Sequence, residues 1–393
     1  MSEIRVGIIT HYFNSTNYGG NLQAYALVEC IHKLGYKAEQ ICYKADKSTL
    51  FRGSNNIQTK HCGFLKLFSK LFHSFCHFAY KVVVGKRKKT ILRFNKESIN
   101  HSKVVYELNT LNDIVNDYNV LITGSDQVWH PSAVCDAYLL NFSDKCRISY
   151  RFSYAASFAV NDLTCEQKIY YNKCLNNLDA ISVRENSALR LVATICEKEA
   201  QMVLDPTLLL SYEDWNMVSS DLEIANKYVL CYFLGPMSIC NSQISQFAKE
   251  KGLKVVSMPF LNSIRQRDTF FGDYKLFNVS PNDFVTLIKN AEYIFTDSFH
   301  ATVFSLIFKK NFFVFNRENY IDMNCRIYSL IDLFDTCDRF CDNKEKCTLE
   351  YIKSLPSIDY DREFPKFEAM KKKSINFLKV NLKKAEEKLN VVD

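Results

Sequence analysis

The sequence predicts an α/β protein in which two Rossmann-like domains face each other across a cleft and a long helix ends the chain. Three observations support this prediction. A strand–loop–helix–strand pattern opens the sequence, a second series of alternating strands and helices follows residue 215, and the last residues form a charged helical pattern. The length of 393 residues suits two domains of ordinary size. We therefore predict a first domain over residues 1–205, a second over 206–360 and a helix over 361–393.

The predicted first domain begins with a βαβ unit. Residues 4–10 form an apolar run, and a polar loop follows at 11–20. Apolar residues at helical spacing then occupy 22–34, with Gly35 as a stop, and a second strand is predicted at 38–43. This order of elements is typical of a Rossmann-like domain. Further strand patterns lie at 119–129, 147–158 and 178–186.

The predicted second domain repeats this alternation after a connecting stretch that ends at Trp215. Apolar runs and amphipathic stretches alternate along it, which favours another parallel sheet covered by helices. We predict strands at 227–235, 253–260, 292–298 and 311–316, and a helix at 280–291.

Composition excludes several classes of protein. Hydrophobic residues make up 47% of the chain, enough for globular cores, and no apolar run approaches the roughly 18 residues that a membrane-spanning helix requires. The N-terminal stretch lacks the features of a secretory signal peptide, so we expect a cytoplasmic location. Fifteen cysteines are scattered without a Cys-x-x-Cys pair, which indicates reduced thiols and no metal site.

One segment makes the protein basic. Residues 47–96 contain twelve Lys and Arg and no Asp or Glu, whereas the rest of the chain holds 38 basic against 43 acidic residues. Within this insertion, residues 64–80 place Phe and Leu on one helical face and Lys and His on the other. This helix either packs on its own domain or lies on an anionic membrane, with the basic run 86–89 beside it. No nucleic-acid motif accompanies the segment, so nucleic acid is not expected as a partner.

Three polar stretches follow predicted strands, at the sheet edge where α/β proteins bind ligands. The first contains Asn17, Gly19 and Asn21, just before a helix. Glycines allow the backbone to approach a ligand closely, and a helix N-terminus offers unpaired N–H groups. A simple tight turn explains the same residues equally well. The sequence is not a Gly-x-Gly-x-x-Gly fingerprint, so no dinucleotide is implied.

The second polar stretch is Thr123–Trp129, which contains Ser125, Asp126 and Gln127. Asp126 is placed to accept a proton from a sugar hydroxyl, and the indole of Trp129 to stack on a pyranose face. Alternatively, Asp126 caps the next helix.

The third polar stretch, residues 296–302, brings a histidine to the first turn of a predicted helix. His300 can donate a charge-assisted hydrogen bond to an anion, or a proton near neutral pH. Ser298 and Thr302 add hydroxyl groups beside it. Although a lone histidine is usually structural, these polar neighbours favour a functional role.

Five segments, taken in order, resemble the polysaccharide pyruvyl transferase family over roughly residues 4–335. They are GIITHYFNSTNYGGNLQAYAL, TGSDQVW, ISVRENSALRLV, VLDPTLLL and FTDSFHATVFSLIFKKNFFVF. The resemblance implies a fold like the GT-B glycosyltransferases, with the acceptor mainly on the first domain and phosphoenolpyruvate on the second. It implies transfer of pyruvate to two hydroxyls of one sugar as a ketal, with release of phosphate. No cofactor is expected, because phosphoenolpyruvate is a co-substrate.

The resemblance also suggests roles for individual residues. It places His300 at the donor phosphate, as an acid or electrostatic stabiliser, and makes Asp126 the base toward the acceptor. Arg184 matches an arginine typical of the family, and Ser298 stands where many members have an arginine. We expect the donor to be bound by Arg184, Ser298, Thr302, Arg317 and Arg326, since arginine grips planar anions bidentately. We expect the acceptor to be bound by Asn17, Gly19, Asn21, Ser125, Gln127 and Trp129.

Two other functions fit the same pattern. A GT-B glycosyltransferase that uses a nucleotide sugar would have the same fold and a similar cleft. A non-catalytic scaffold of a glycan-assembly complex would fit the missing arginine at Ser298 and the basic insertion. If the acceptor is a lipid-linked oligosaccharide for an exopolysaccharide or capsule, we expect the protein to contact the inner face of the membrane peripherally.

Overall fold

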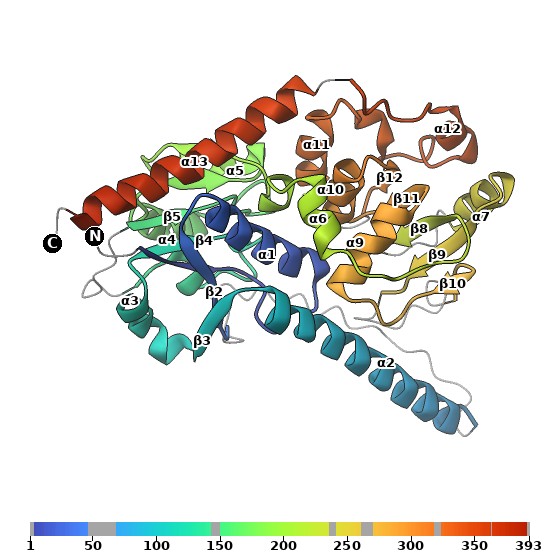
Figure 1. The fold of residues 1–393 in the computed structure, drawn as a ribbon, viewed down its shortest axis with the longest axis horizontal. Coiled ribbons are helices and arrows are strands. Elements are labelled where there is room, and N and C mark those ends of the chain that lie inside the picture. Colours follow the sequence, from blue (N-terminus) through green and yellow to red (C-terminus); the bar gives the residue numbers. More distant parts are fainter. Residues whose placement is uncertain are drawn as a thin grey trace.

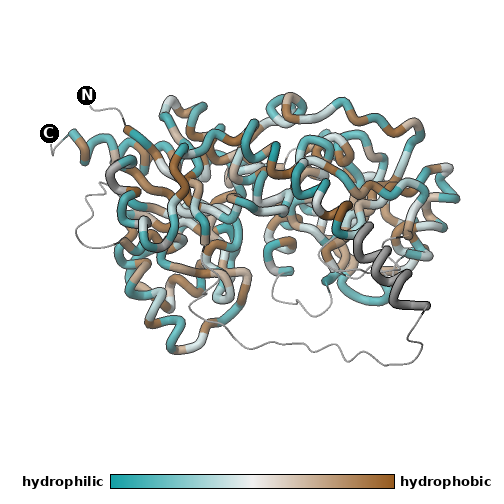
Figure 2. Tube along the Cα trace, turned by 90° about the horizontal axis from the view of Figure 1, so that it is seen from below, coloured by the Kyte–Doolittle hydropathy of each residue, from teal (hydrophilic) through white to brown (hydrophobic). Residues whose placement is uncertain are grey.

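The computed structural model describes residues 4–45, 68–142, 150–235, 241–260, 270–317, 324–362 and 364–390, and the side chains of its longest helix from Tyr80 onward. The chain forms two parallel sheets with helices packed on them (Figure 1). Seen from below in Figure 2, the two halves lie side by side. The predicted α/β class with two strand–helix series is thus confirmed.

The first sheet has the strand order β3-β2-β1-β4-β5, with β1 in the centre. Val6 of β1 pairs with Ala38 on one side and Val120 on the other. Central parallel strands are buried on both faces, which explains why they appear as unbroken apolar runs in the sequence. The strands are β1 (Arg5–Ile9), β2 (Lys37–Tyr43), β3 (His101–Tyr106), β4 (Val120–Thr123) and β5 (Tyr150–Ser153).

A short parallel pair, β6 (Ile181–Val183) and β7 (Ala200–Met202), continues this sheet beyond β5. Single bridges link the pair to the chain around β5, at Phe152 with Ala180 and Ala156 with Val183. The helices of this half are α1 (Tyr18–Lys33), α2 (Phe68–Ser98), η1 (Leu108–Asp113), α3 (Ile114–Asp117), η2 (Ala137–Leu139), α4 (Cys165–Leu175), α5 (Asn186–Ile195), η3 (Pro206–Leu208) and α6 (Tyr212–Val218).

The second sheet has the order β10-β9-β8-β11-β12-β13. Its strands are β8 (Tyr228–Tyr232), β9 (Lys254–Met258), β10 (Tyr274–Lys275), β11 (Tyr293–Thr296), β12 (Asn311–Phe315) and β13 (Phe340–Cys341). Its helices are α7 (Asn241–Glu250), α9 (Pro281–Asn290), α10 (Phe299–Ile307), α11 (Cys325–Asp332), η5 (Cys337–Arg339) and α12 (Leu349–Ser354). The last strand of the first sheet ends at Met202 and the second sheet begins at Tyr228, so the predicted boundary near residue 205 falls in the connection.

The final helix, α13 (Pro365–Asn390), leaves the second half and runs back along the first (Figure 1). Tyr150 of β5 donates a hydrogen bond to Asn381 at 2.9 Å, and the Phe152 and Phe377 rings lie 6.1 Å apart. The predicted C-terminal helix is therefore confirmed, and its buried face packs on the first sheet.

Helix α2 connects the two halves from the other side. Its Arg87 donates to the carbonyl of Pro259 at 2.9 Å and lies over the ring of Tyr18. Thr90 donates to the side chain of Asn278. The apolar face predicted at 64–79 lies outside the described residues and side chains. No helix in the described part of the chain is long and apolar enough to cross a membrane.

A continuous cluster of buried apolar side chains passes from one half to the other at the start of α1. The rings of Tyr18 and Phe284 are stacked, with centroids 5.1 Å apart, and the Tyr18 hydroxyl donates to the carbonyl of Val279 at 2.8 Å. This contact holds the N-terminus of α1 against the second half, beside the start of α10.

Candidate functional site

A tight turn after β4 carries the first carboxylate of the site. Gly124 has φ 112° and its Cα faces the carbonyl oxygen of Tyr154, so a side chain at this position would clash with that backbone. The amide of Ser125 donates to the side chain of Gln23 at 3.1 Å. Asp126 also has a positive φ, of 72°, and its carboxylate lies at the carboxyl edge of the first sheet. No helix begins there, so Asp126 does not serve as a helix cap.

Arg184 follows β6 and lies in the centre of the site. Its Nη1 donates to Asp205 Oδ2 at 2.6 Å and its Nη2 to Asp126 Oδ1 at 3.2 Å. The guanidinium also lies 4.5 Å from the ring centroid of Phe299, which belongs to the second half. Its Nε is buried and has no hydrogen-bond partner among the described residues. Arg184 therefore joins two carboxylates of the first half to a helix of the second.

Asp205 is the residue of the site that the sequence prediction missed. It is fully buried and precedes Pro206, where it caps η3. Its Oδ1 accepts from the amide and hydroxyl of Thr207 at 3.1 and 2.6 Å. Its Oδ2 accepts from Ser125 Oγ at 3.1 Å as well as from Arg184. The Asp-Pro pair in VLDPTLLL was the available signal, but it indicates a turn cap and gives no sign of the contact with Arg184.

His300 approaches this cluster from the opposite half, at the first turn of α10. Its Nε2 lies 3.8 Å from Asp205 Oδ2 and is buried without a hydrogen-bond partner among the described residues. The other side of the ring faces Gly19, where a Cβ atom would overlap the imidazole. Glycine is therefore required at position 19 for the histidine to reach the first half.

A second arginine, Arg326 of α11, completes the site. With the amide oxygen of Gln127 turned toward it, that oxygen accepts from both Nη atoms at 2.9 and 3.0 Å. The guanidinium lies 5.8 Å from the ring centroid of Phe299. We name the charged residues that meet here the carboxyl-edge cluster: Asp126, Arg184, Asp205, His300 and Arg326.

Burial and neighbouring charges shift the pKa values of the cluster in opposite directions. Burial alone would raise the pKa of Asp126, but the positive charge of Arg184, aided by His300 and Arg326, lowers that pKa to about 2. Asp205 behaves in the same way, since burial is again outweighed by Arg184 and the pKa is lowered. Burial lowers the pKa of His300 despite the neighbouring carboxylates, so its imidazole is neutral at pH 7.

The remaining donor candidates lie apart from the cluster or use their polar groups elsewhere. Arg317 pairs with Asp297, with Nε 3.1 Å from Oδ2, at the ends of β12 and β11. Ser298 caps α10 by accepting from the amide of Ala301. The hydroxyl of Thr302 is buried and donates to the carbonyl of Ser298, so the expected contact of this hydroxyl with the donor is not available.

Several acceptor candidates also use their polar groups for contacts within the protein. Asn17 caps α1, and Asn21 donates to the carbonyl of Ser15 while its Oδ1 is buried and unpartnered in the described structure. Trp129 is fully buried and donates through Nε1 to the carbonyl of Tyr138. The interpretation of Trp129 as a sugar-stacking residue is therefore wrong, because this indole belongs to the core of the first half.

A small cavity of about 20 Å³ lies beside Arg184, Asp205 and Phe299. Within the described residues, no group of three or more His, Cys, Asp or Glu side chains is arranged to hold a metal ion.

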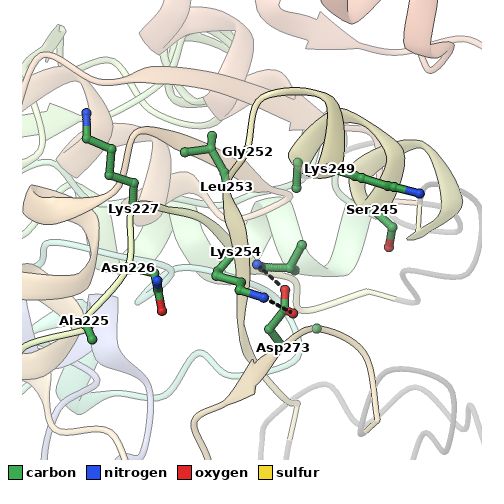
Figure 3. A pocket seen from close by; sticks show the side chains of 12 residues that line it. Ala225, Asn226, Lys227, Ser245, Lys249, Gly252, Leu253, Lys254 and Asp273 are labelled. Carbon is green, nitrogen blue, oxygen red and sulfur yellow. Dashed lines mark hydrogen bonds and ion pairs between the residues drawn. The ribbon is translucent and has the colours of Figure 1, made fainter.

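A larger hollow of about 800 Å³ lies at the amino edge of the second sheet, opposite the cluster (Figure 3). Lys227, Lys249 and Lys254 surround it, and Lys254 pairs with Asp273 at 3.3 Å. These side chains are exposed, and this hollow contains none of the residues predicted from the sequence.

Comparisons with known proteins agree with this architecture. A family model described as polysaccharide pyruvyl transferase matches residues 17–319. No curated protein matches the chain. The UDP-GlcNAc 2-epimerase of Methanocaldococcus jannaschii has a similar structure, with a TM-score of 0.58 at 12% identity over 96% of this chain and 99% of that one.

Two further epimerase structures are similar. The enzyme from Rickettsia bellii has a TM-score of 0.55 at 11% identity, with 98% of each chain covered. The Neisseria meningitidis enzyme, solved with UDP-GlcNAc, has a TM-score of 0.54 at 10% identity, with 97% of this chain and 100% of that one covered. At such identities the likeness shows the fold alone, and it confirms the GT-B-like arrangement.

Proposed function

Because this chain belongs to the polysaccharide pyruvyl transferase family, we propose that it transfers a pyruvyl group from phosphoenolpyruvate to a sugar of a polysaccharide or of its lipid-linked precursor. The observation that supports this proposal is the carboxyl-edge cluster. Arg184 from one half and Arg326 and His300 from the other meet at facing sheet edges, beside the N-terminus of α10. A donor that carries both a carboxylate and a phosphate needs such fixed positive groups.

The reaction balances without an oxidant or a metal-bound group. The methylene carbon of the donor gains a proton and becomes a methyl group, while one sugar oxygen bonds to the adjacent enol-ether carbon. The bond from that carbon to the phosphate oxygen then breaks, and a second sugar oxygen takes its place. The two sugar hydroxyls lose two protons in total, of which one ends on the methyl group and one on the released phosphate. The product is a cyclic ketal of pyruvate.

His300 is suited to act on the phosphate. Its Nε2 has no hydrogen-bond partner in the described part of the chain, and its imidazole is neutral because burial lowers the pKa. A phosphate dianion beside the ring would favour the imidazolium and raise the pKa, so the histidine would become charged as the donor binds. The charged ring then stabilises the departing phosphate and donates a proton to it.

The acceptor fits the first half. Gly19 and Asn21 begin α1, and Ser125 to Gln127 follow β4, so both stretches border the cluster from the same side. Asp126 is the carboxylate among them that can accept a hydroxyl proton, provided that its pairing with Arg184 is relieved. Arg317 remains a candidate for the donor only if its contact with Asp297 is exchanged.

Three assays on the purified protein test the proposal. Phosphoenolpyruvate and candidate lipid-linked glycans should yield one phosphate per glycan, and mass spectrometry should show the glycan heavier by one pyruvate minus water. Release of a nucleotide from a nucleotide sugar, with no consumption of phosphoenolpyruvate, would instead identify a glycosyltransferase. If neither donor is consumed while the protein binds glycan enzymes, a scaffold role replaces both.

We further propose that α2 brings the enzyme to an anionic membrane surface, where lipid-linked acceptors are held. Between residues 81 and 97, its exposed face carries six cations and one acid: Lys81, Lys86, Lys88, Lys89, Arg93, Lys96 and Glu97. Each cation near an anionic bilayer contributes about 1 kcal/mol. Arg87 is not available for this contact, because it binds the carbonyl of Pro259. This corrects the expectation that all four cations of the run 86–89 face the membrane.

Replacing the exposed cations of α2 by glutamine should reduce sedimentation with vesicles that contain phosphatidylserine, and the wild-type binding should fall at high salt. The substitutions are Lys86→Gln, Lys88→Gln, Lys89→Gln and Arg93→Gln. Helix α13 lies at the opposite margin of the molecule in Figure 1 and supplies a control of equal charge. Its matched substitutions are Lys372→Gln, Lys373→Gln, Lys379→Gln and Lys383→Gln, all exposed. Equal loss in both variants, or no vesicle binding at low salt, would exclude α2 as the membrane contact.

A further inference from the structure

Two carboxylates share the guanidinium of Arg184, and they differ in how firmly they are held. The Asp205 side chain is 0% exposed, lies 2.6 Å from Nη1 and accepts three more hydrogen bonds from Ser125 and Thr207. The Asp126 side chain is 11% exposed and lies 3.2 Å from Nη2, which is its one hydrogen bond within the described structure. Asp205 is therefore part of a fixed network, whereas Asp126 holds Arg184 through a single longer contact.

The cluster already holds enough negative charge for its arginines. Asp126 and Asp205 face Arg184 and Arg326, the buried Glu185 adds a third carboxylate near Arg184, and His300 is neutral. A donor that brings a carboxylate and a phosphate would add negative charge to a buried site, where unpaired charge is costly. One of the two aspartates must then give up Arg184, and the weaker bonding of Asp126 identifies it as the one that moves.

The structure also offers a place for the displaced carboxylate. Asp126 Oδ2 lies 3.7 Å from the Cβ position of Gly20, in the first turn of α1. The N-terminus of a helix favours negative charge, and Gly20 has no side chain to obstruct the approach. A small rotation of Asp126 toward α1 would thus exchange one positive partner for another.

We propose that Asp126 is an internal placeholder for the donor: it occupies Arg184 in the empty site and is displaced by an anionic group of the donor, while Asp205 holds Arg184 throughout. This inference rests on the proposed function. It assigns different tasks to two aspartates that contact the same arginine.

The exchange couples the two substrates. Four positive or titratable groups face Asp126: Arg184 after β6, His300 of α10, Arg326 of α11 and His11 after β1. Once Arg184 turns to the donor, the pKa of Asp126 rises, and the carboxylate becomes a better acceptor for the proton of a sugar hydroxyl. The base toward the acceptor is thus activated when the donor is in place.

Calorimetric binding of phosphoenolpyruvate, and separately of inorganic phosphate, tests this exchange without turnover. Asp126→Asn keeps the shape of the side chain and removes its charge, so it should bind both anions about tenfold more tightly than the wild type. The same variant should turn over at least about a hundredfold more slowly, since an amide cannot accept the proton. Asp205→Asn should instead bind the anions more weakly, because Arg184 loses its fixed partner.

Asp273→Asn is the matched control, because it removes a carboxylate from an exposed Lys–Asp pair at the amino edge of the second sheet, away from the cluster. It should leave both affinities unchanged. If the wild type binds phosphoenolpyruvate and Asp126→Asn binds it no more tightly, the placeholder is refuted while the proposed function stands. Tighter binding by Asp205→Asn would reverse the two roles and equally refute the proposal. If the wild type binds neither anion, both the exchange and the proposed donor are wrong.

Discussion

The carboxyl-edge cluster and the amino edge of the second sheet both carry charged side chains, but they use charge differently. In the cluster, the charges are buried and paired: the side chains of Arg184 and Asp205 are 3% and 0% exposed. At the amino edge, Lys254 and Asp273 are 49% and 42% exposed and pair within one half. The amino edge has the larger hollow, about 800 Å³ against about 20 Å³.

Volume is therefore a poor guide to function in this molecule. Charges in water are screened and exchange partners at little cost, so an exposed pair contributes about 0–1 kcal/mol. Buried charges depend on each partner, and removal of one partner costs about 3–5 kcal/mol. The carboxyl-edge cluster can thus respond to a bound anion with a change of ion pairing and protonation, whereas the exposed pair at the amino edge cannot. Four predictions test this contrast.

The largest effect is expected for His300→Ala. This change removes the one titratable side chain that reaches the cluster from α10, so turnover should fall by about two orders of magnitude or more. Phosphate release under saturating substrates measures it, with thermal unfolding as the control for folding. Turnover within a few-fold of wild type in a folded variant would mean that another group acts on the phosphate.

Gly19→Ala should have a smaller but clear effect. The backbone φ at Gly19 is negative, so alanine fits the helix, but its Cβ would overlap the His300 ring and push it away. We expect about a tenfold or greater loss of kcat/KM with little loss of stability. Gly85→Ala in α2 is the matched control, because nothing lies within 4 Å of its Cβ position. Equal activity of the two variants would show that the ring moves aside without consequence.

Stability should depend on pH through three histidines that are buried or partly buried. Burial lowers the pKa of His11, His130 and His300 in the folded state. The unfolded chain therefore binds more protons, and stability is complete above about pH 6.5 and is lost as the pH falls toward the lowered values. Thermal unfolding between pH 8 and 5.5 should show a decreasing Tm, less steep in His300→Gln. A Tm independent of pH in that range would contradict the assignment of neutral histidines.

The smallest effects are expected at the amino edge. Lys254→Gln or Asp273→Asn breaks an exposed pair, so the free energy of unfolding should change by no more than about 1 kcal/mol and turnover should be unchanged. Denaturant unfolding and phosphate release measure the two quantities. A tenfold loss of activity in either variant would indicate that this hollow takes part in the reaction, and it would contradict the contrast between the two regions.

Much of the fold could be predicted because parallel strands are buried on both faces. Residues 4–10 and 292–298 show this as apolar runs, and the structure contains β1 and β11 there. The same reasoning placed Asp126, Arg184 and His300 at carboxyl ends of strands, and the structure brings these three side chains together.

The parts that could not be predicted depend on contacts between distant segments. Asp205 has the sequence signature of a turn cap, and only the packing of β6 against β7 brings it to Arg184. A tryptophan after a strand can lie in the core or at the surface. Only the packing of the neighbouring loop buries Trp129. Arg326 joins the cluster because it reaches Gln127 of the first half, whereas Arg317 pairs with Asp297, and local patterns do not encode this difference.

The return of α13 to the first half has a mechanical consequence. The chain enters the second half after α6 and leaves it before α13, so two connecting segments join the halves rather than one (Figure 1). A body tethered at two points can turn about the line between them but resists twisting or sliding. A relative motion of the halves would therefore favour rotation about that line. When the halves close again, His300 would return to the same position beside Arg184 and Asp205.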